Sequence, residues 1–257
     1  MQAMTKNQAS AWVDDLYGKV ELRWKERVLE TELMRRLRAG TLPLEALAFL
    51  FRHGYAQYAI EINTLWGCTY QKFLPFFKQH VDLMAAVGDK IADEFLHPEP
   101  PGHALILFQT CEALGVSRQE VLSNPVLPEL RGLIDLSRAI LYEGTAAEWF
   151  ARAASEKMVG VWTGQCRQAL TSNYGFTPEQ GIYFSKHEEA DLQEHDQGVM
   201  GHGEFNATVL VRLLETGSAW ERPGCGMEYC ALANADLWAL MFDQALALFE
   251  SRQLVRA

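Results

Sequence analysis

Apolar residues recur every three or four positions along most of the chain, which is the spacing of one face of an α-helix. Between residues 11 and 38 this spacing predicts a first helix, and Gly40 would end it as a C-cap residue. Thr41 as an N-cap, with Pro43 and an acidic first turn, predicts a second helix that runs to about Phe73. The alternating patterns typical of β-strands are almost absent, so the chain is predicted to be all-helical.

The same spacing predicts further helices along the rest of the chain, with a proline-rich loop between two of them at residues 98–102. These helices are expected at about 79–95, 103–115, 117–122, 128–142, 145–172, 177–194 and beyond, 205–215, and 228–253. No internal repeat and no linker rich in glycine and serine separates them. We therefore expect one helical domain over residues 1–257, with its core at about 20–250.

The composition excludes several classes of protein. The chain has 23 Lys and Arg against 33 Asp and Glu, so its formal net charge is −10. This acidic balance disfavours binding to nucleic acid or to an anionic membrane. The chain shows neither a secretory signal pattern nor a membrane-length apolar run, and we expect a cytoplasmic protein. Its five cysteines are scattered without a C-x-x-C pair, which argues against disulfides or a structural zinc site.

Three places put side chains that could bind a metal on otherwise apolar helices. Glu94 ends one predicted helix and His103 begins the next, so a tight turn would bring them together. Glu156 lies in a stretch of small and apolar residues, where an unpaired carboxylate is costly. His187 and Asp191 lie one turn apart on one helix face. Taken singly, each place has an ordinary explanation: a solvated helix end, a surface salt bridge, or an exposed acidic helix.

Taken together, the three places indicate a metal site more strongly than any one of them does alone. Imidazole and carboxylate side chains projecting into one helical bundle suit a pair of ferrous ions. Magnesium or calcium would favour oxygen ligands alone, and zinc would commonly bring cysteine or three histidines. The side chains therefore predict a site for two Fe(II) ions.

At these residues the sequence resembles the haem-oxygenase-like diiron oxidases, relatives of the TenA and PqqC proteins. The family pattern is a Glu then a His across a helix turn, a mid-chain Glu, and a late helix reading His-x-x-x-Asp-x-x-His. The stretches Ala154–Trp162 and Val126–Arg131 look similar to the undecene-forming fatty-acid decarboxylase of this family. The resemblance covers about residues 30–215 and implies a haem-oxygenase-like helical bundle.

Carried over residue by residue, the resemblance assigns metal binding to Glu94, His103, Glu156, His187 and Asp191. The last ligand departs from the pattern, because Glu194 stands where the family has His and His195 comes one position later. We favour His195 and keep Glu194 as the alternative. A weakened or partly occupied second iron site follows from either choice. His97 competes with His103, since some members place this His three residues after the Glu.

The resemblance implies an O₂-dependent oxidoreductase acting on a small aliphatic or amino acid. The expected outcomes are oxidative decarboxylation, C–C cleavage, or oxygenation of an amine nitrogen, as part of natural-product biosynthesis. We expect Tyr58, Trp162 and Tyr183 to line the substrate pocket, although aromatic residues at helical spacing are more often core. The expected partners are a small-molecule substrate and an external reductant, with a homodimer left open.

The alternative function is that of the thiaminase branch of the same fold. A TenA-like enzyme would hydrolyse an aminopyrimidine with a nucleophilic cysteine and acidic partners, without a metal. Cys111 and Cys166 are the candidate nucleophiles. A third interpretation is a helical binding protein that uses its acidic helix at 188–196 as a partner surface.

Overall fold

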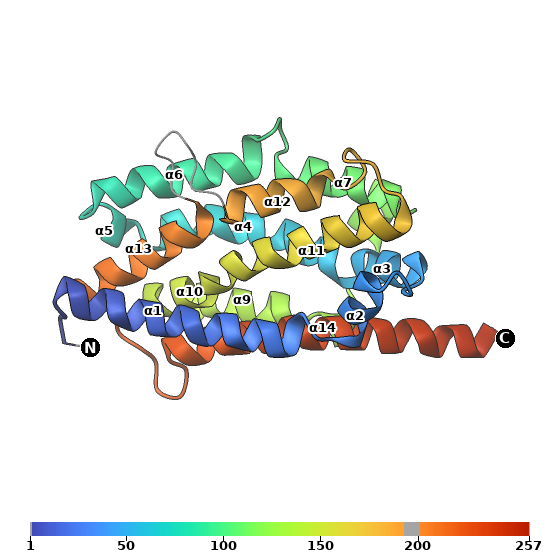
Figure 1. The fold of residues 1–257 in the computed structure, drawn as a ribbon. Coiled ribbons are helices and arrows are strands. Elements are labelled where there is room, and N and C mark those ends of the chain that lie inside the picture. Colours follow the sequence, from blue (N-terminus) through green and yellow to red (C-terminus); the bar gives the residue numbers. More distant parts are fainter. Residues whose placement is uncertain (1, 193–200, 257) are drawn as a thin grey trace.

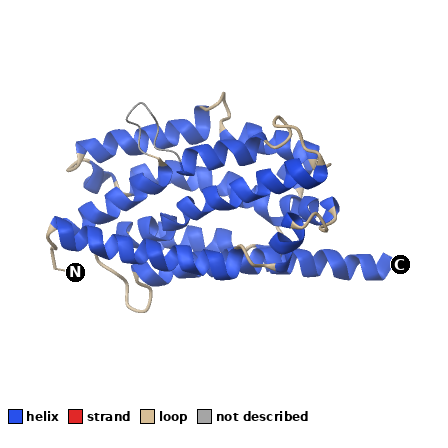
Figure 2. Ribbon diagram, in the orientation of Figure 1, coloured by secondary structure: helices blue, strands red, loops and turns tan. Residues whose placement is uncertain are grey.

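The computed structural model describes residues 2–192 and 201–256, and in these ranges helices form the whole regular structure, without a β-strand (Figures 1 and 2). None of the described helices has both the length and the apolar character needed to cross a membrane. The α-helices are α1 (Lys6–Arg23), α2 (Glu32–Arg38), α3 (Leu44–Leu50), α4 (Ala56–Lys72), α5 (Leu74–Phe77), α6 (Val81–Leu96), α7 (His103–Ala113), α8 (Arg118–Ser123), α9 (Gly132–Glu143), α10 (Ala146–Arg152), α11 (Glu156–Tyr174), α12 (Ile182–Leu192), α13 (His202–Glu215) and α14 (Met227–Arg256). Short irregular turns are π-helical at η1 (Trp24–Val28) and η2 (Phe51–Tyr55), and 3₁₀-helical at η3 (Pro128–Leu130) and η4 (Ala153–Ser155).

The prediction of an all-helical fold is confirmed, but the first predicted helix is not one continuous helix. α1 runs through the π-helical turn η1, and the chain then breaks before α2 begins at Glu32. At this break the hydroxyl of Thr31 donates to the carbonyl of Val28, so that carbonyl has a hydrogen-bond partner. The N-cap of α3 is Pro43 and not Thr41, because the Thr41 hydroxyl turns back to the carbonyl of Arg36.

The helices run roughly along one long direction, and α6, α7 and α12 lie together along one edge of the bundle (Figure 1). α12 packs against α11 and α7, and α6 packs against α4 and α7. On the opposite edge, α1 and α14 lie side by side, and α14 also packs against α9 and α10. The faces of α6, α7, α11, α12 and α13 that carry candidate metal-binding side chains therefore meet within one half of the bundle.

A cluster of fully buried aromatic rings forms the core beneath that half. Trp238 of α14 lies 5.2 Å from Trp24 and 5.3 Å from Trp162, measured between ring centroids. Tyr55 packs against both Trp162 and Trp238. Burying large aromatic side chains supplies much of the favourable free energy of folding. The cluster thus gives the polar side chains above it a rigid base.

The turn between α6 and α7 needs glycine at position 102. Gly102 has φ of 70°, a left-handed conformation that residues with a Cβ rarely adopt. A Cβ at this position would also collide with the backbone carbonyl of Glu94. The absence of a side chain therefore lets α7 start directly beside the end of α6, which brings His103 next to Glu94.

Candidate metal site

Three side chains form what we call the histidine-rich group: Glu94 of α6, His103 of α7 and His187 of α12. Nδ1 of His103 lies 2.9 Å from Oε2 of Glu94. The imidazole rings of His103 and His187 are 4.5 Å apart between centroids. Nδ1 of His187 lies 3.0 Å from the backbone carbonyl of Tyr183. That bond selects the tautomer protonated at Nδ1, so the lone pair of Nε2 is free to bind a metal.

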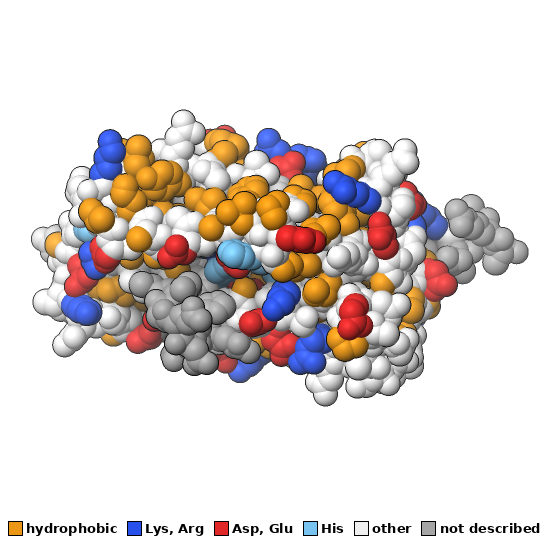
Figure 3. Space-filling view, turned by 90° about the horizontal axis from the view of Figure 1, so that it is seen from above, with side chains coloured by type: hydrophobic (Ala, Val, Ile, Leu, Met, Phe, Trp, Pro, Cys, Tyr) orange, Lys and Arg blue, Asp and Glu red, His pale blue; other side chains and the backbone are white. Residues whose placement is uncertain are grey.

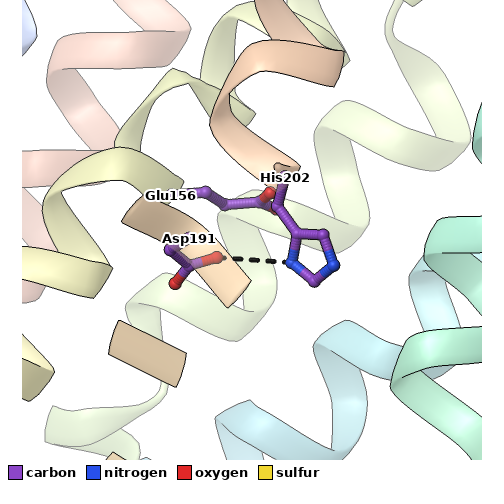
Figure 4. A group of neighbouring side chains, drawn as sticks. All are labelled: Glu156, Asp191 and His202. Carbon is purple, nitrogen blue, oxygen red and sulfur yellow. Dashed lines mark ion pairs between the residues drawn. The ribbon is translucent and has the colours of Figure 1, made fainter. Parts of the chain in front are cut away.

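A second set, the carboxylate-rich group, consists of Glu156 of α11, Asp191 of α12 and His202 of α13 (Figure 4). One ligand atom from each lies within 4.8 Å of the others, close enough to share one cation. Nδ1 of His202 lies 3.3 Å from Oδ1 of Asp191 and 3.9 Å from Oε1 of Glu94. Glu94 therefore lies between the two groups and joins them.

Two glycines, Gly160 and Gly203, help to position the side chains of the carboxylate-rich group. A Cβ on Gly160 would lie 2.8 Å from Cβ of Asp191 and 2.7 Å from Cγ of Leu192, so α12 approaches α11 only because residue 160 is glycine. The hydroxyl of Tyr17 donates to the carbonyl of Gly203, 3.0 Å away, and ties the start of α13 to α1. His202 is the first residue of α13, so this contact fixes its position.

Glu156 is already paired with a cation from the protein. Nζ of Lys90 lies 2.7 Å from Oε2 of Glu156, and the Lys90 side chain is only 2 % exposed. The same oxygen accepts a hydrogen bond from the Asn206 amide at 2.8 Å. The Lys90 ammonium also lies 4.3 Å from the centre of the Trp66 ring. The carboxylate-rich group thus contains an internal positive charge, whereas none of the described residues forms a comparable lysine or arginine ion pair with Glu94.

Asp93, next to Glu94, faces the outer edges of two rings. Its Oδ2 lies 3.2 Å from Nε2 of His202 and 3.5 Å from Nε2 of His103. Both rings therefore turn Nδ1 toward the carboxylates between the helices and Nε2 toward Asp93. A carboxylate beside the far nitrogen of a metal-binding histidine is the usual outer support of such ligands.

Burial and mutual contacts shift the pKa values of these residues in opposite directions. Removal from water lowers the pKa of His187 to about 3, with the nearby His103 adding to the effect, so His187 is neutral. Burial would lower the pKa of His202 as well, as would Lys90, but Asp191 and Asp93 outweigh both and raise it to about 9. Burial would raise the pKa of Glu94, yet His103, His202 and Lys90 hold it below the usual range. The network therefore mixes a neutral imidazole, His187, with a protonated one, His202.

Several buried atoms of the network lack a hydrogen-bond partner among the described residues: Oδ2 of Asp93, Oε2 of Glu94 and Nδ1 of His103. Their contacts are short but are not aligned as hydrogen bonds. Glu148, a fully buried carboxylate elsewhere, is different: its oxygens accept from the backbone and guanidinium of Arg222 at 2.8 Å. Buried polar groups are normally satisfied, and a bound cation would satisfy the donor atoms of this network. Their chemistry, imidazole with carboxylate, suits a divalent transition-metal ion.

The structure brings together five of the predicted ligands: Glu94, His103, Glu156, His187 and Asp191. His195 and its alternative Glu194 lie outside the described residues. His97 is exposed at the end of α6 and lines an outer depression with Asp93 and His103. Figure 3 shows histidine beside acidic side chains near the middle of one face.

Sequence reasoning missed His202 as a member of the site, along with Lys90. His202 opens an apolar helix after a glycine, which is the same signal that singles out His103. Lys90 falls on the buried stripe of α6 with Leu83, Val87 and Glu94, at spacings of three and four residues. A lysine on such a stripe must be paired, because a buried charge without a partner is costly.

A small cavity of about 50 Å³ lies directly beside both groups. Tyr58 and Tyr183 line it, whereas Trp162 lies behind it in the aromatic core. The hydroxyls of Tyr183 and Tyr55 are 2.6 Å apart on its wall. The full lining is Tyr55, Tyr58, Ala59, Ile62, Asn63, Trp66, Glu94, Arg152, Glu156, Val159, Tyr183, His187, Asp191, His202 and Trp238.

No family model matches the sequence, and no curated protein matches it either. Several solved structures share the fold. A TenA homolog from Pseudomonas syringae pv. tomato superposes with a TM-score of 0.72 at 16 % identity, covering 96 % of this chain and 98 % of that one. A TenA homologue from P. horikoshii gives 0.62 at 14 % identity over 91 % and 97 %. A protein from Shewanella denitrificans, described as a domain of unknown function with a heme oxygenase-like fold, gives 0.62 at 15 % over 93 % and 94 %. The chain therefore has the TenA and haem-oxygenase-like helical fold, as predicted.

Proposed function

We propose that this protein is a non-haem diiron oxidoreductase that uses O₂ to oxidise a small aliphatic or amino acid. One observation carries the proposal: six imidazole and carboxylate side chains from five helices meet beside one cavity, and some of their buried atoms lack a partner among the described residues. The histidine-rich group would hold one Fe(II) and the carboxylate-rich group the other, with Glu94 between them. In this proposal His202 takes the place of the final histidine of the family pattern.

Two ferrous ions, when bound, would supply the electrons for reduction of O₂. The protein's own residues hold these ligands in place and keep water away. Tyr183 fixes the tautomer of His187 through its backbone carbonyl, and Asp93 faces the outer nitrogens of His103 and His202. Tyr58, Trp66 and Tyr183 line part of the cavity, and excluding water there would strengthen charge interactions.

The reaction outcome is part of the same proposal. Oxidative decarboxylation, C–C cleavage and N-oxygenation all start from an aliphatic or amino acid held beside the metals. An external reductant, and a role in natural-product biosynthesis in the cytoplasm, extend the proposal from the family resemblance. The small cavity, of about 50 Å³, favours a short acid or an amino acid over a long-chain fatty acid.

The alternative, metal-free hydrolysis by a cysteine nucleophile, has less support at the two candidate thiols. Burial raises the pKa of Cys111 to about 12 and raises that of Cys166 still further. A nucleophilic cysteine needs a lowered pKa and access to the substrate, and neither thiol lines the cavity beside the acidic cluster. We expect Cys166→Ala to leave turnover unchanged within about two-fold, because a fully buried thiol serves packing. Loss of activity in Cys166→Ala, with retention in His187→Ala, would favour the hydrolase.

The direct test is anaerobic loading with Fe(II), followed by O₂ uptake in the presence of short fatty acids and amino acids. We expect iron binding and acid-dependent O₂ consumption by the native protein, and loss of both in His187→Ala. The matched control is His97→Ala, which changes an exposed histidine of the same neighbourhood and should retain native iron. Native iron content in His187→Ala, or no iron in the native protein, would refute the proposal.

A further inference from the structure

Arg152, at the end of α10, is a buried cation on the wall of the cavity. Its side chain is among the most buried of the charged residues, with 2 % of the residue exposed. Nε and Nη1 have no hydrogen-bond partner among the described residues, and no described carboxylate forms an ion pair with this guanidinium. The guanidinium stacks on the Trp149 ring at 4.6 Å, which supports it from behind.

A guanidinium keeps its charge at any physiological pH and offers five N–H donors in a fixed planar fork. Burying it without an anion costs free energy, which a ligand anion would recover. The nearby carboxylates face other cations: Glu156 is bound to Lys90, and Asp191 faces His202. The hydroxyl of Tyr58, on the same cavity wall, is a hydrogen-bonding neighbour of Arg152. Nε and Nη1 remain without a partner among the described residues, beside the cavity that Glu94, Glu156 and His187 line.

We propose that Arg152 binds the carboxylate of the substrate, so that the protein selects small carboxylic acids over neutral analogues. The neighbouring wall suits the rest of such a molecule, because Ile62, Trp66 and Val159 provide apolar contact for an alkyl or amino-acid side chain. Carboxylate and guanidinium match in a two-pronged geometry that an amide cannot reproduce with the same strength. This inference deepens the proposed oxidation by naming the group recognised, and it rests on the same cavity.

Binding can be measured separately from oxidation, by calorimetry without O₂ on iron-free and Fe(II)-loaded protein. The probes are butyrate and leucine, each compared with its primary amide, butanamide and leucinamide. We expect at least one acid to bind about ten-fold or more tightly than its amide, since hydrogen bonds to a charged group are the stronger ones. In Arg152→Gln this preference should disappear, and in Arg152→Lys it should be partly kept. Arg138→Gln, at a partly exposed arginine paired with Glu61, is the matched control.

The variants also separate this inference from the diiron proposal. Arg152→Gln with native iron content but without preference for acids supports the inference. An unchanged preference in folded Arg152→Gln, or equal binding of acids and amides by the native protein, overturns it. If Arg152→Gln fails to fold, the decision falls to Arg152→Lys, where an unchanged preference would count against the two-pronged contact. Native protein that binds no iron and still prefers acids would refute the diiron proposal alone.

Discussion

The histidine-rich and carboxylate-rich groups lie side by side, yet the protein treats their charges differently. Around Glu94 and His103 the buried ligand atoms are close together and lack aligned hydrogen-bond partners among the described residues. Around Glu156 the carboxylate is paired with Lys90 and bound by Asn206. The first group therefore resembles a prepared cation site, whereas the second already holds a cation of the protein's own.

This difference predicts unequal affinities of the two groups for iron. An ammonium next to Glu156 repels an incoming metal ion and competes for the same oxygen. The histidine-rich group contains His187, whose lowered pKa leaves it neutral and ready to bind without releasing a proton. We expect the first iron to occupy the histidine-rich group and the second to bind more weakly.

The largest effect is expected from removing the carboxylate that lies between the groups. Glu94→Ala should weaken iron binding by more than about 100-fold, because Glu94 faces both His103 and His202. Glu156→Gln should remove only the weaker iron and leave about one per chain. Metal analysis after anaerobic loading measures both, with Glu112→Ala, an exposed position on α7, as the control. Equal loss in the two variants would contradict the unequal affinities.

The outer carboxylate should affect both groups together. Asp93→Asn keeps the shape of the side chain but removes the negative charge that faces His103 and His202. We expect the iron affinity to fall about 10–100-fold, the usual cost of losing such support. Competition with a coloured chelator gives the two affinities separately. A loss confined to one group would mean that Asp93 supports one ring alone.

Lys90→Met tests the internal cation directly. Without the ammonium, the second iron should bind about ten-fold more tightly, because a repelling charge next to Glu156 is gone. The metal-free variant should also lose about 1–3 kcal/mol of unfolding free energy, since Glu156 loses its ion-pair partner. Denaturant titrations with and without Fe(II) measure both changes. Lys157→Met, at an exposed lysine of α11, is the control. Second-iron affinity that is unchanged or weaker would refute the role given to Lys90.

The smallest effect concerns the packing behind Asp191. In Gly160→Ala the new Cβ would press on Asp191 and Leu192, and we expect a cost of about 1–3 kcal/mol with weaker binding of the second iron only. Gly88→Ala is the matched control on α6, where a Cβ would meet nothing within 4 Å. That control should stabilise the helix by up to about 1 kcal/mol. Thermal unfolding and iron titration would show whether the two glycines differ as expected.

The sequence by itself determined the helices and the faces that carry chemistry, because both follow from local spacing. His187 and Asp191 had to share a face of α12, and Gly102 allowed a turn that joins Glu94 to His103. Most element boundaries also followed from caps and breakers, although the π-helical turn η1 and the break after it were not visible in the apolar pattern.

Only the tertiary structure decided which side chains meet across helices. His202 joins Asp191, Lys90 pairs with Glu156, and Arg152 lines the same cavity with no described carboxylate as an ion-pair partner. Asp191 and His202 are 11 positions apart in the sequence, and Lys90 and Glu156 are 66 apart. Helical periodicity carries no information about which face of one helix packs against another. The physical reason is that pairing of buried charges depends on distances of a few ångströms, which the packing of the whole bundle sets.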